Sequence, residues 1–361
     1  MVTGAECPDQ LVCDNVMKQH SDPMSRNEIF LAADIGGTKT DMALYAAAAD
    51  GPHLIHGERL ANRKARNVAE LVNRFLAGDT HQPRNAVFAV AGPVRDGRVR
   101  MTNLGWLLDS DALAKRFSLN RVILINDLEA LALAAVHLPP SDLVTVNRGE
   151  ADPVGHVAVL APGTGLGEAL LIRRQSRWLP VASEGGHTAF APADDEQIAL
   201  LRYLLAQGRE KVSVEDVCSG RAVPELYRFC RQESAIPAPL PDTGEEEQTP
   251  AIVAAALAAR QEHNREHAAL RAMRLFIDIL AGEAADLALT TLATGGVYIG
   301  GGLPPRLLPF FEPRAFMACF ARGVYREMLA RIPIRIITCP DAALRGAALH
   351  GYQQFRPAGE P

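Results

Sequence analysis

The fold class of this chain is indicated by one stretch near its start, IFLAADIGGTKTDMALYAA, residues 29–47. An apolar run typical of a buried strand, Ile29–Asp34, ends at Gly36 and Gly37, and a second strand-like run follows over Asp41–Ala47. The two glycines are therefore expected at the tip of a hairpin. Because glycine lets backbone N–H groups approach a ligand closely, such a turn also suits an anion site.

The same arrangement recurs further along the chain. Val157–Ala161 predicts a strand, the glycine turn Gly163–Gly167 follows it, and Ala169–Arg173 predicts the next strand. Two copies indicate a duplicated fold with a site between its halves, although hairpins of this kind also occur without duplication. A third glycine turn, Gly300–Gly302, follows the short predicted strand Val297–Ile299.

Around these turns, predicted strands alternate with predicted helices, which is the pattern of α/β layers. Further strands are expected over Ala86–Val90, Arg121–Ile125 and Ile332–Thr338, and helices over Arg63–Gly78, Asp109–Phe117, Leu128–His137 and Ala342–Phe355. Residues 193–232 predict two helices, residues 251–292 one long helix, and residues 307–311 a short one. Residues 235–250 are rich in proline and acid and are expected to form a surface loop.

Length and composition exclude several classes of protein. The chain has 361 residues, which at roughly 150 residues per domain indicates two domains. A net charge of −5 argues against a nucleic-acid partner. No apolar run approaches the roughly 18 residues of a membrane helix, so no membrane partner is expected. Residues 1–26 predict a disordered polar lead-in without a signal-peptide core, and a start at Met1 or at Met24 stays open.

The six cysteines form no Cys-x-x-Cys pair and have no histidine at zinc-finger spacing. Neither a structural zinc site nor a disulfide framework is expected. Reduced thiols of this kind are typical of a cytoplasmic protein.

Polar residues that follow predicted strands supply the candidate chemistry. Asp34 is a hard oxygen ligand suited to Mg²⁺, directly or through water, although it could equally close an Asx-type turn. Asn126 and Asp127 lie at a strand-to-helix junction, where a carboxylate can act as a general base on a hydroxyl group. Ordinary helix capping is the alternative for both, and one could cap while the other faces the site.

Two further candidates lie on predicted turns of the second half. Glu184 and His187 flank a pair of glycines, so both side chains could face one polar ligand, or the segment could be a plain surface turn. Glu215, taken alone, is typical of a capping-box carboxylate.

Taken in order, these motifs resemble a known superfamily. The segment Ala33–Thr38 resembles the phosphate-1 motif of the actin/hexokinase/heat-shock ATPases, Gly163–Gly167 their phosphate-2 motif and Gly295–Gly302 their adenosine motif. Within that superfamily, residues 125–127, 184–192 and 213–220 resemble the bacterial glucokinases. The cysteine-rich zinc motif of the related repressor/open-reading-frame/kinase family is missing, which places the chain with the non-zinc glucokinases.

The resemblance runs from about Ile29 to about Gln354 and implies an α/β fold of two domains, the actin-like ATPase (ribonuclease H-like) fold with a cleft between a small and a large domain. Residues 27–137 together with 342–361 would form the small domain and residues 138–341 the large one. The family likeness also implies a homodimer.

The activity implied by the resemblance is that of a glucokinase. Such an enzyme transfers phosphate from ATP to the 6-hydroxyl of D-glucose and so supplies glucose 6-phosphate to glycolysis, with Mg²⁺ near Asp34. Asp127 would be the general base, and Asn126, Glu184, His187 and Glu215 would bind the other sugar hydroxyls. The residues implied for ATP are Ala33, Asp34, Ile35, Gly36, Gly37, Thr38, Gly163, Thr164, Gly165, Gly301 and Gly302. Residues 102–106 match a substrate-side segment of the family.

Other functions remain open on the same fold. The chain could phosphorylate another hexose or use another phosphoryl donor. It could also be a sugar-sensing regulator without catalysis, although such a protein usually carries a DNA-binding extension, and Asp127 is intact. An assembly or chaperone ATPase would lack the residues Glu184 and His187.

Overall fold

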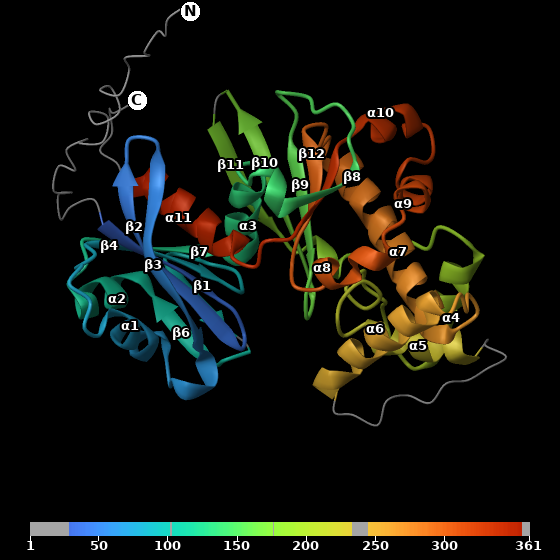
Figure 1. The fold of residues 1–361 in the computed structure, drawn as a ribbon, viewed down its shortest axis with the longest axis horizontal. Coiled ribbons are helices and arrows are strands. Elements are labelled where there is room, and N and C mark those ends of the chain that lie inside the picture. Colours follow the sequence, from blue (N-terminus) through green and yellow to red (C-terminus); the bar gives the residue numbers. More distant parts are fainter. Residues whose placement is uncertain (1–28, 102, 176, 233–244, 356–361) are drawn as a thin grey trace, which may run out of the picture.

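The computed structural model of the chain describes residues 29–101, 103–175, 177–232 and 245–355. Two large mixed sheets lie on either side of a pair of packed helices, α3 (Asp127–Ala135) and α11 (Ala342–Phe355) (Figure 1). The expected lead-in, residues 1–26, and Thr102 lie outside the described residues. The expected α/β class is confirmed.

The first sheet has the strand order β3-β2-β1-β4-β7. Its strands are β1 (Ile29–Ile35), β2 (Lys39–Ala48), β3 (Gly51–Ala61), β4 (Asn85–Val90) and β7 (Arg121–Asn126). Strands β1, β2 and β3 are antiparallel neighbours, whereas β1, β4 and β7 run parallel. The expected hairpin with Gly36 and Gly37 at its tip is therefore present.

The second sheet has the order β11-β10-β9-β12-β13-β8. Its strands are β8 (Leu143–Asn147), β9 (Val157–Pro162), β10 (Leu166–Arg174), β11 (Arg177–Ser183), β12 (Gly296–Ile299) and β13 (Ile334–Ile337). The first five strands repeat the directions of the first sheet, three antiparallel and then two parallel to β9. The second sheet differs by the added antiparallel edge strand β8. This repeat supports the expected duplication.

Helices cover both faces of the first sheet because β1 is apolar on both of its sides. Alternate residues of a strand point to opposite faces. Ile29, Leu31 and Ala33 pack with α1 (Val68–Leu76) and α2 (Ser110–Phe117), beside the small sheet of β5 (Arg98–Met101) and β6 (Trp106–Asp109). Phe30 and Ala32 pack with α3 and α11. Helix α3 is buried along most of its length, as its nearly unbroken apolar sequence requires.

The second sheet packs against the helices of the second half. They are α4 (Asp195–Ala206), α5 (Val223–Gln232), α6 (Glu245–Gln261), α7 (Ala268–Thr291), α8 (Pro304–Leu307), α9 (Pro313–Phe320) and α10 (Arg326–Arg331). The long helix α7 is central to this core (Figure 1). Short 3-10 turns occur at Asn62–Lys64, Pro140–Asp142, Gly185–His187 and Leu308–Phe310. Within the described ranges, each helix is too short or too polar to span a bilayer.

The prediction of one helix over residues 251–292 is wrong. Helix α6 ends at Gln261, and α7 begins at Ala268 with the His267 ring accepting a hydrogen bond from the Ala269 N–H at 3.2 Å. Residues 261–267 contain no apolar side chain to hold them against the core, and His263 adopts a left-handed backbone conformation with φ of 58°. The chain therefore turns between two helices.

The expected loop over 235–250 is also partly wrong, because residues 245–250 belong to α6. The strong helix formers of residues 245–261 outweigh Pro250 near the helix start. Residues 235–244 lie outside the described part of the chain. The predicted helix over Arg63–Gly78 begins only at Val68, where the Asn67 side chain accepts from the Glu70 N–H at 3.1 Å and caps it.

Candidate functional site

Parallel register brings the first group of candidate residues to one edge of the first sheet. Ile35 of β1 lies opposite Val90 of β4, and Val90 lies opposite Asn126 of β7. Asp34 is thus one residue from the edge at which α3 begins with Asp127. The negative charge of Asp127 also acts on the Asp34 carboxyl group, which places the two side chains near each other.

Asn126 is the helix cap of this junction. Its Oδ1 accepts from the Leu128 N–H at 2.9 Å and the Glu129 N–H at 3.3 Å, while Glu129 Oε2 accepts from the Asn126 N–H at 3.2 Å. The Asn126 amide nitrogen donates to the Gly92 carbonyl at 3.2 Å. Of the two alternatives for Asn126 and Asp127, capping therefore applies to Asn126.

Asp127 is left as the partly exposed carboxylate of the junction. Its Oδ1 accepts from the Leu128 N–H at 3.0 Å. Burial raises the pKa of Asp127 to about 6, the hydrogen bond from Leu128 opposes that rise, and the charge of Glu184 adds to it. The side chain is therefore ionised at neutral pH but close enough to its pKa to accept a proton.

Asp34 lies in a region of excess negative charge. Burial raises its pKa to about 7, and the charges of Asp127 and Asp41 raise it further, against the opposing charges of Lys39 and Arg59. Arg59 is already engaged, because its Nε and Nη2 donate to the two Asp41 oxygens at 2.5 and 2.9 Å. An added cation at this position would stabilise the ionised form of Asp34.

Asn62 holds the glycine turn after β1 through hydrogen bonds, and the sequence analysis did not identify this residue. The Gly36 N–H donates to the Lys39 carbonyl at 3.0 Å. Asn62 is buried, donates through Nδ2 to the Gly36 carbonyl at 2.9 Å and accepts from Thr40 Oγ1 at 2.7 Å. Its own N–H donates to the Thr38 carbonyl at 3.0 Å. Asn62 has no motif signal, because it lies 26 residues beyond the turn it holds.

Two of the residues expected near ATP, Ala33 and Ile35, are fully buried in the core. Only their backbone atoms could contribute to a site. On the other side of the turn, a Cβ placed on Gly37 would lie 3.6 Å from Asn103 Nδ2. Asn103 is therefore adjacent to the turn.

The glycine turn after β9 is tied to Glu215. The Gly163 N–H donates to the Gly165 carbonyl at 2.8 Å, and the Leu166 N–H donates to Glu215 Oε2 at 2.8 Å. A Cβ on Gly165 would overlap that same carboxylate oxygen. The alternative role of Glu215 as a capping-box carboxylate does not apply, because Asp216 accepts those bonds from Ser213.

The third glycine turn packs against the end of β9. Gly301 has a φ of 86°, and a Cβ there would lie 2.7 Å from the Pro162 carbonyl oxygen. The Leu303 N–H donates to the same carbonyl at 3.3 Å. The second and third glycine turns are therefore neighbours, as the order β9–β12 requires.

Glu184 and His187 present their side chains to solvent on one short turn. Glu184 Oε2 and His187 Nε2 are 3.9 Å apart, and the side chains are 72% and 61% exposed. Below them, the Glu215 N–H donates to the Gly186 carbonyl at 2.8 Å, so Glu215 connects this turn to the glycine turn after β9. The charge that Glu184 exerts on Asp127 places the turn near α3.

The two halves of the chain approach each other at the start of α3. A Cβ on Gly167, at the start of β10, would lie 2.6 Å from Leu128 Cδ2. The first turn of α3, which carries Asp127, therefore packs directly against the end of the second glycine turn.

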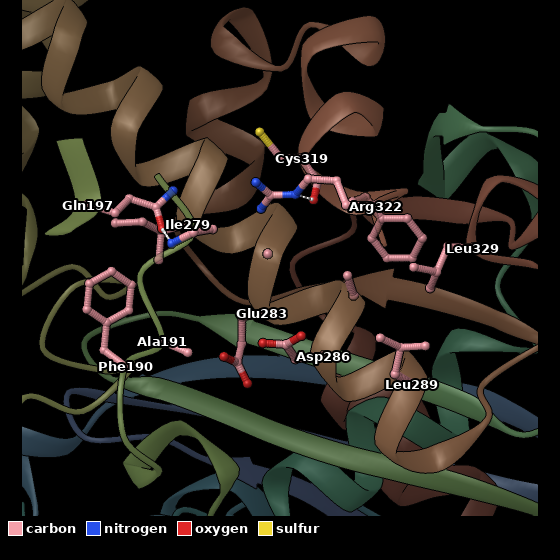
Figure 2. A pocket seen from close by; sticks show the side chains of 14 residues that line it. Phe190, Ala191, Gln197, Ile279, Glu283, Asp286, Leu289, Cys319, Arg322 and Leu329 are labelled. Atoms are coloured by element: carbon pink, nitrogen blue, oxygen red, sulfur yellow. Dashed lines mark hydrogen bonds between the residues drawn. The ribbon is translucent and has the colours of Figure 1, made fainter. Parts of the chain in front are cut away.

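A cavity of about 120 Å³ lies apart from these residues, between α7, α9 and the segment after His187 (Figure 2). Phe190, Glu283, Asp286 and Arg322 are among its walls, and none of the predicted site residues lines it. In the described part of the chain no group of three or more histidine, cysteine, aspartate or glutamate side chains could hold a metal ion.

Comparison with known proteins gives one consistent result. The family model for glucokinase matches residues 31–354. The glucokinase of Nostoc sp. is 36% identical over 335 residues, which cover 89% of this chain and 98% of that protein. The crystal structure of a glucokinase from an Antarctic psychrotroph has a TM-score of 0.77 at 30% identity, over 90% of this chain and 99% of that one.

A more distant structure shares the fold. A ROK family glucokinase from Streptomyces griseus, in complex with glucose and AMPPNP, has a TM-score of 0.59 at 21% identity, over 89% of this chain and 98% of that one. The two structures confirm the expected two-domain, actin-like ATPase fold.

Proposed function

The chain belongs to the glucokinase family, and from that premise we propose how its residues carry out the reaction of an ATP-dependent hexose kinase. The observation that carries the assignment of residues is the junction of β7 and α3. There Asn126 caps the helix and leaves Asp127 as a carboxylate whose pKa is about 6, with the charge of Glu184 close by.

Asp127 would orient the 6-hydroxyl of glucose and accept its proton. Asn126, Glu184, His187 and Glu215 would bind the remaining hydroxyls. Each retains the capacity to do so: the Asn126 amide has a second N–H, Glu215 has a second oxygen beyond the one bonded to Leu166, and Glu184 and His187 face solvent. Several polar groups on separate segments are needed because a sugar has many similar hydroxyl groups. Only one of them must lie in line with the phosphoryl group that is transferred.

The three glycine turns would hold ATP. Backbone N–H groups of residues 33–38 and 163–165 would cradle the phosphates, and Gly301 and Gly302 would lie against the adenosine. The glucokinase from Streptomyces griseus that was solved with glucose and AMPPNP has this fold, which supports a sugar and a nucleotide bound together.

Mg²⁺ would lie at Asp34. The excess negative charge around that carboxylate fits a divalent cation, and a hard oxygen donor is the ligand that Mg²⁺ prefers. Because Asp34 has no partner ligands in a cluster within the described residues, phosphate oxygens and water would complete the shell. The ion would neutralise charge that develops on the transferred phosphoryl group.

We also propose the domain division expected from the sequence, residues 27–137 with 342–361 against residues 138–341. It is supported by α11, which packs on β1 and β4 of the first sheet although it is distant from them in the sequence. A cytoplasmic homodimer is the assembly and location proposed. Among the described cysteines, Cys218, Cys319 and Cys339 are free thiols, which suits a reducing compartment.

A coupled assay of ADP release tests the proposed function. ADP formation that depends on glucose is expected, and a panel with mannose, fructose and glucosamine defines the sugar preference. ADP release without sugar would indicate an ATPase, and absence of turnover with every hexose would indicate a sensor.

The Glu184→Gln variant is expected to raise the KM for glucose about tenfold with a much smaller change in the KM for ATP. Glutamine still forms neutral hydrogen bonds, but a charge-assisted bond to a sugar hydroxyl is lost. Loss of the Glu184 charge should also lower the pKa of Asp127. Steady-state kinetics with each substrate varied measures the two KM values, and the pH dependence of kcat/KM measures the pKa of Asp127.

The control is Glu262→Gln, because Glu262 is an exposed carboxylate in the turn between α6 and α7. Its kinetic constants should match those of the wild type. Identical glucose KM values for Glu184→Gln and the wild type would remove Glu184 from the sugar site.

The Asn62→Ala variant is expected to raise the KM for ATP about fivefold to tenfold. It removes two hydrogen bonds that hold the Gly36–Thr40 turn, each with a net value of about 0.5–1.5 kcal/mol. The matched control is Asn67→Ala, which loses a helix cap nearby but touches no part of that turn. An ATP KM that changes equally in both variants would contradict a specific role for Asn62.

A further inference from the structure

A buried carboxyl group lies directly behind the turn that carries Glu184 and His187. Glu168 of β10 is 1% exposed, and its Oε2 atom fills the space in which a side chain on Gly185 would begin. Register places Glu168 opposite Ser183 of β11, whose Oγ accepts from the Gly185 N–H at 2.9 Å. Glu168 and Ser183 therefore support the same point of the turn.

The carboxyl group of Glu168 lies beside that of Glu283 of α7, close enough for a hydrogen bond between them once one of the two carries a proton. Burial, followed by the charge of Glu283, raises the pKa of Glu168 to about 8; burial also raises the pKa of Glu283, and the bond from Glu168 opposes that rise. Burial and the mutual repulsion of the two carboxylates therefore favour one proton held between Glu168 and Glu283 at neutral pH.

The surroundings of the second carboxyl oxygen of Glu168 are consistent with an uncharged carboxyl group. Glu168 Oε1 is buried and has no hydrogen-bond partner. Leaving a neutral carbonyl oxygen unpaired in the interior costs about 1–3 kcal/mol, whereas an unpaired buried charge costs far more.

The surroundings of the pair supply no opposing charge to Glu168. Cys218 is buried beside both carboxyls, and burial raises its thiol pKa well above the usual value, so it is neutral. The charge of Asp286 acts on Glu283, and the charge of Arg322 in turn acts on Asp286. Figure 2 shows Glu283 and Asp286 beside each other. Among the described residues, Glu283 is the charged side chain that acts on Glu168. Glu283 also lines the 120 Å³ cavity.

We propose that Glu168 is a positioning residue for the sugar, which holds the turn of residues 184–187 in its binding conformation by sharing a proton with Glu283. The proposal rests on the sugar-binding roles of Glu184 and His187. Loss of the shared proton would place two negative charges next to each other in the buried space behind Gly185. Their repulsion would separate the carboxyls and displace the turn.

The test compares the wild type with Glu168→Gln between pH 6.5 and 9.5. If only the protonated pair holds the turn, the wild-type KM for glucose rises about tenfold one pH unit above the Glu168 pKa, while kcat changes much less. Glutamine at position 168 donates a hydrogen bond at every pH, so its KM for glucose should stay level where that of the wild type rises.

Two further variants complete the test. Glu283→Gln also leaves the pair with at most one charge, so it should abolish the rise as well, and it replaces Glu168→Gln if that protein does not fold. Asp286→Asn, on the same helix and outside the pair, should keep the wild-type rise. Equal profiles in the wild type and both glutamine variants, or a level wild-type profile, would overturn the proposal.

The failure of this inference can be told apart from failure of the sugar site. An unchanged glucose KM in Glu184→Gln at pH 7 removes Glu184 from the site. An unchanged pH profile in Glu168→Gln and Glu283→Gln, with Glu184→Gln impaired, overturns the role of Glu168 alone.

Discussion

The Asp127→Asn variant is expected to lower kcat by about 10²- to 10⁴-fold, the usual contribution of a positioned general base. Asparagine has nearly the same shape and can still accept the hydrogen bond from the Leu128 N–H, so the start of α3 should be preserved. It cannot take the proton of the sugar hydroxyl. ADP release under saturating glucose and ATP measures kcat, and a titration with ATP shows whether nucleotide binding is retained.

The control for this variant is Asp109→Asn. Asp109 also lies at a helix start, where its Oδ1 accepts from the Asp111 and Ala112 N–H groups, and asparagine caps as well as aspartate does. Asp109→Asn should therefore turn over at the wild-type rate. Turnover near the wild-type rate in Asp127→Asn would remove Asp127 from the role of base.

The same assignment sets the pH dependence of the wild type. The pKa of Asp127 is raised to about 6, so the protonated, inactive form predominates below that pH. The value of kcat/KM should therefore fall about tenfold for each pH unit below 6. A profile that stays level down to pH 4.5 would contradict the assignment.

The Gly346→Ala variant is expected to be strongly destabilised. Gly346 lies where α11 crosses α3, and a Cβ there would overlap the Ala130 carbonyl oxygen of α3. Because the obstacle is backbone, the helices must separate, which we expect to cost about 1–3 kcal/mol of unfolding free energy. Chemical denaturation or the thermal midpoint measures the loss.

Gly282→Ala provides the matched control, because it is also a glycine in the interior of a helix. A Cβ at Gly282 would meet only the end of the Arg322 side chain, at 3.9 Å. Alanine is favoured over glycine in a helix by about 1 kcal/mol, so this variant should be slightly more stable than the wild type. Equal stability changes in the two variants would show that the α3–α11 crossing is not the cause.

The edge strands β3 and β11 were not predicted from the local sequence pattern. Strand β11 alternates exposed and partly exposed residues and has a single paired neighbour, so its sequence lacks the apolar run that identified β1 and β9. Strand β3 is likewise largely exposed. These strands form because a neighbour offers free backbone groups, which is a property of the sheet.

The supporting residues of the site were missed for a related reason. Asn62 acts on a turn 26 residues earlier in the chain, and Glu168 meets Glu283 only because β10 packs near α7. A glutamate next to a glycine turn carries no local sign that it is buried. Sequence spacing detects groups that act within one turn or strand. Asn62 and the Gly36 turn, and likewise Glu168 and Glu283, are too far apart in the sequence to be detected in this way.

By itself, the sequence determined which segments form the strands beside the three glycine turns and the position of Asp127 at a strand end, because apolar runs and glycines act through local backbone geometry. Only the tertiary structure decided that Asn126 caps while Asp127 stays available, that Glu215 is tied to the second glycine turn, and that Glu168 is buried beside Glu283. Those outcomes depend on burial and on charges brought together from distant segments, and a pKa or a hydrogen-bond partner exists only once the chain has folded.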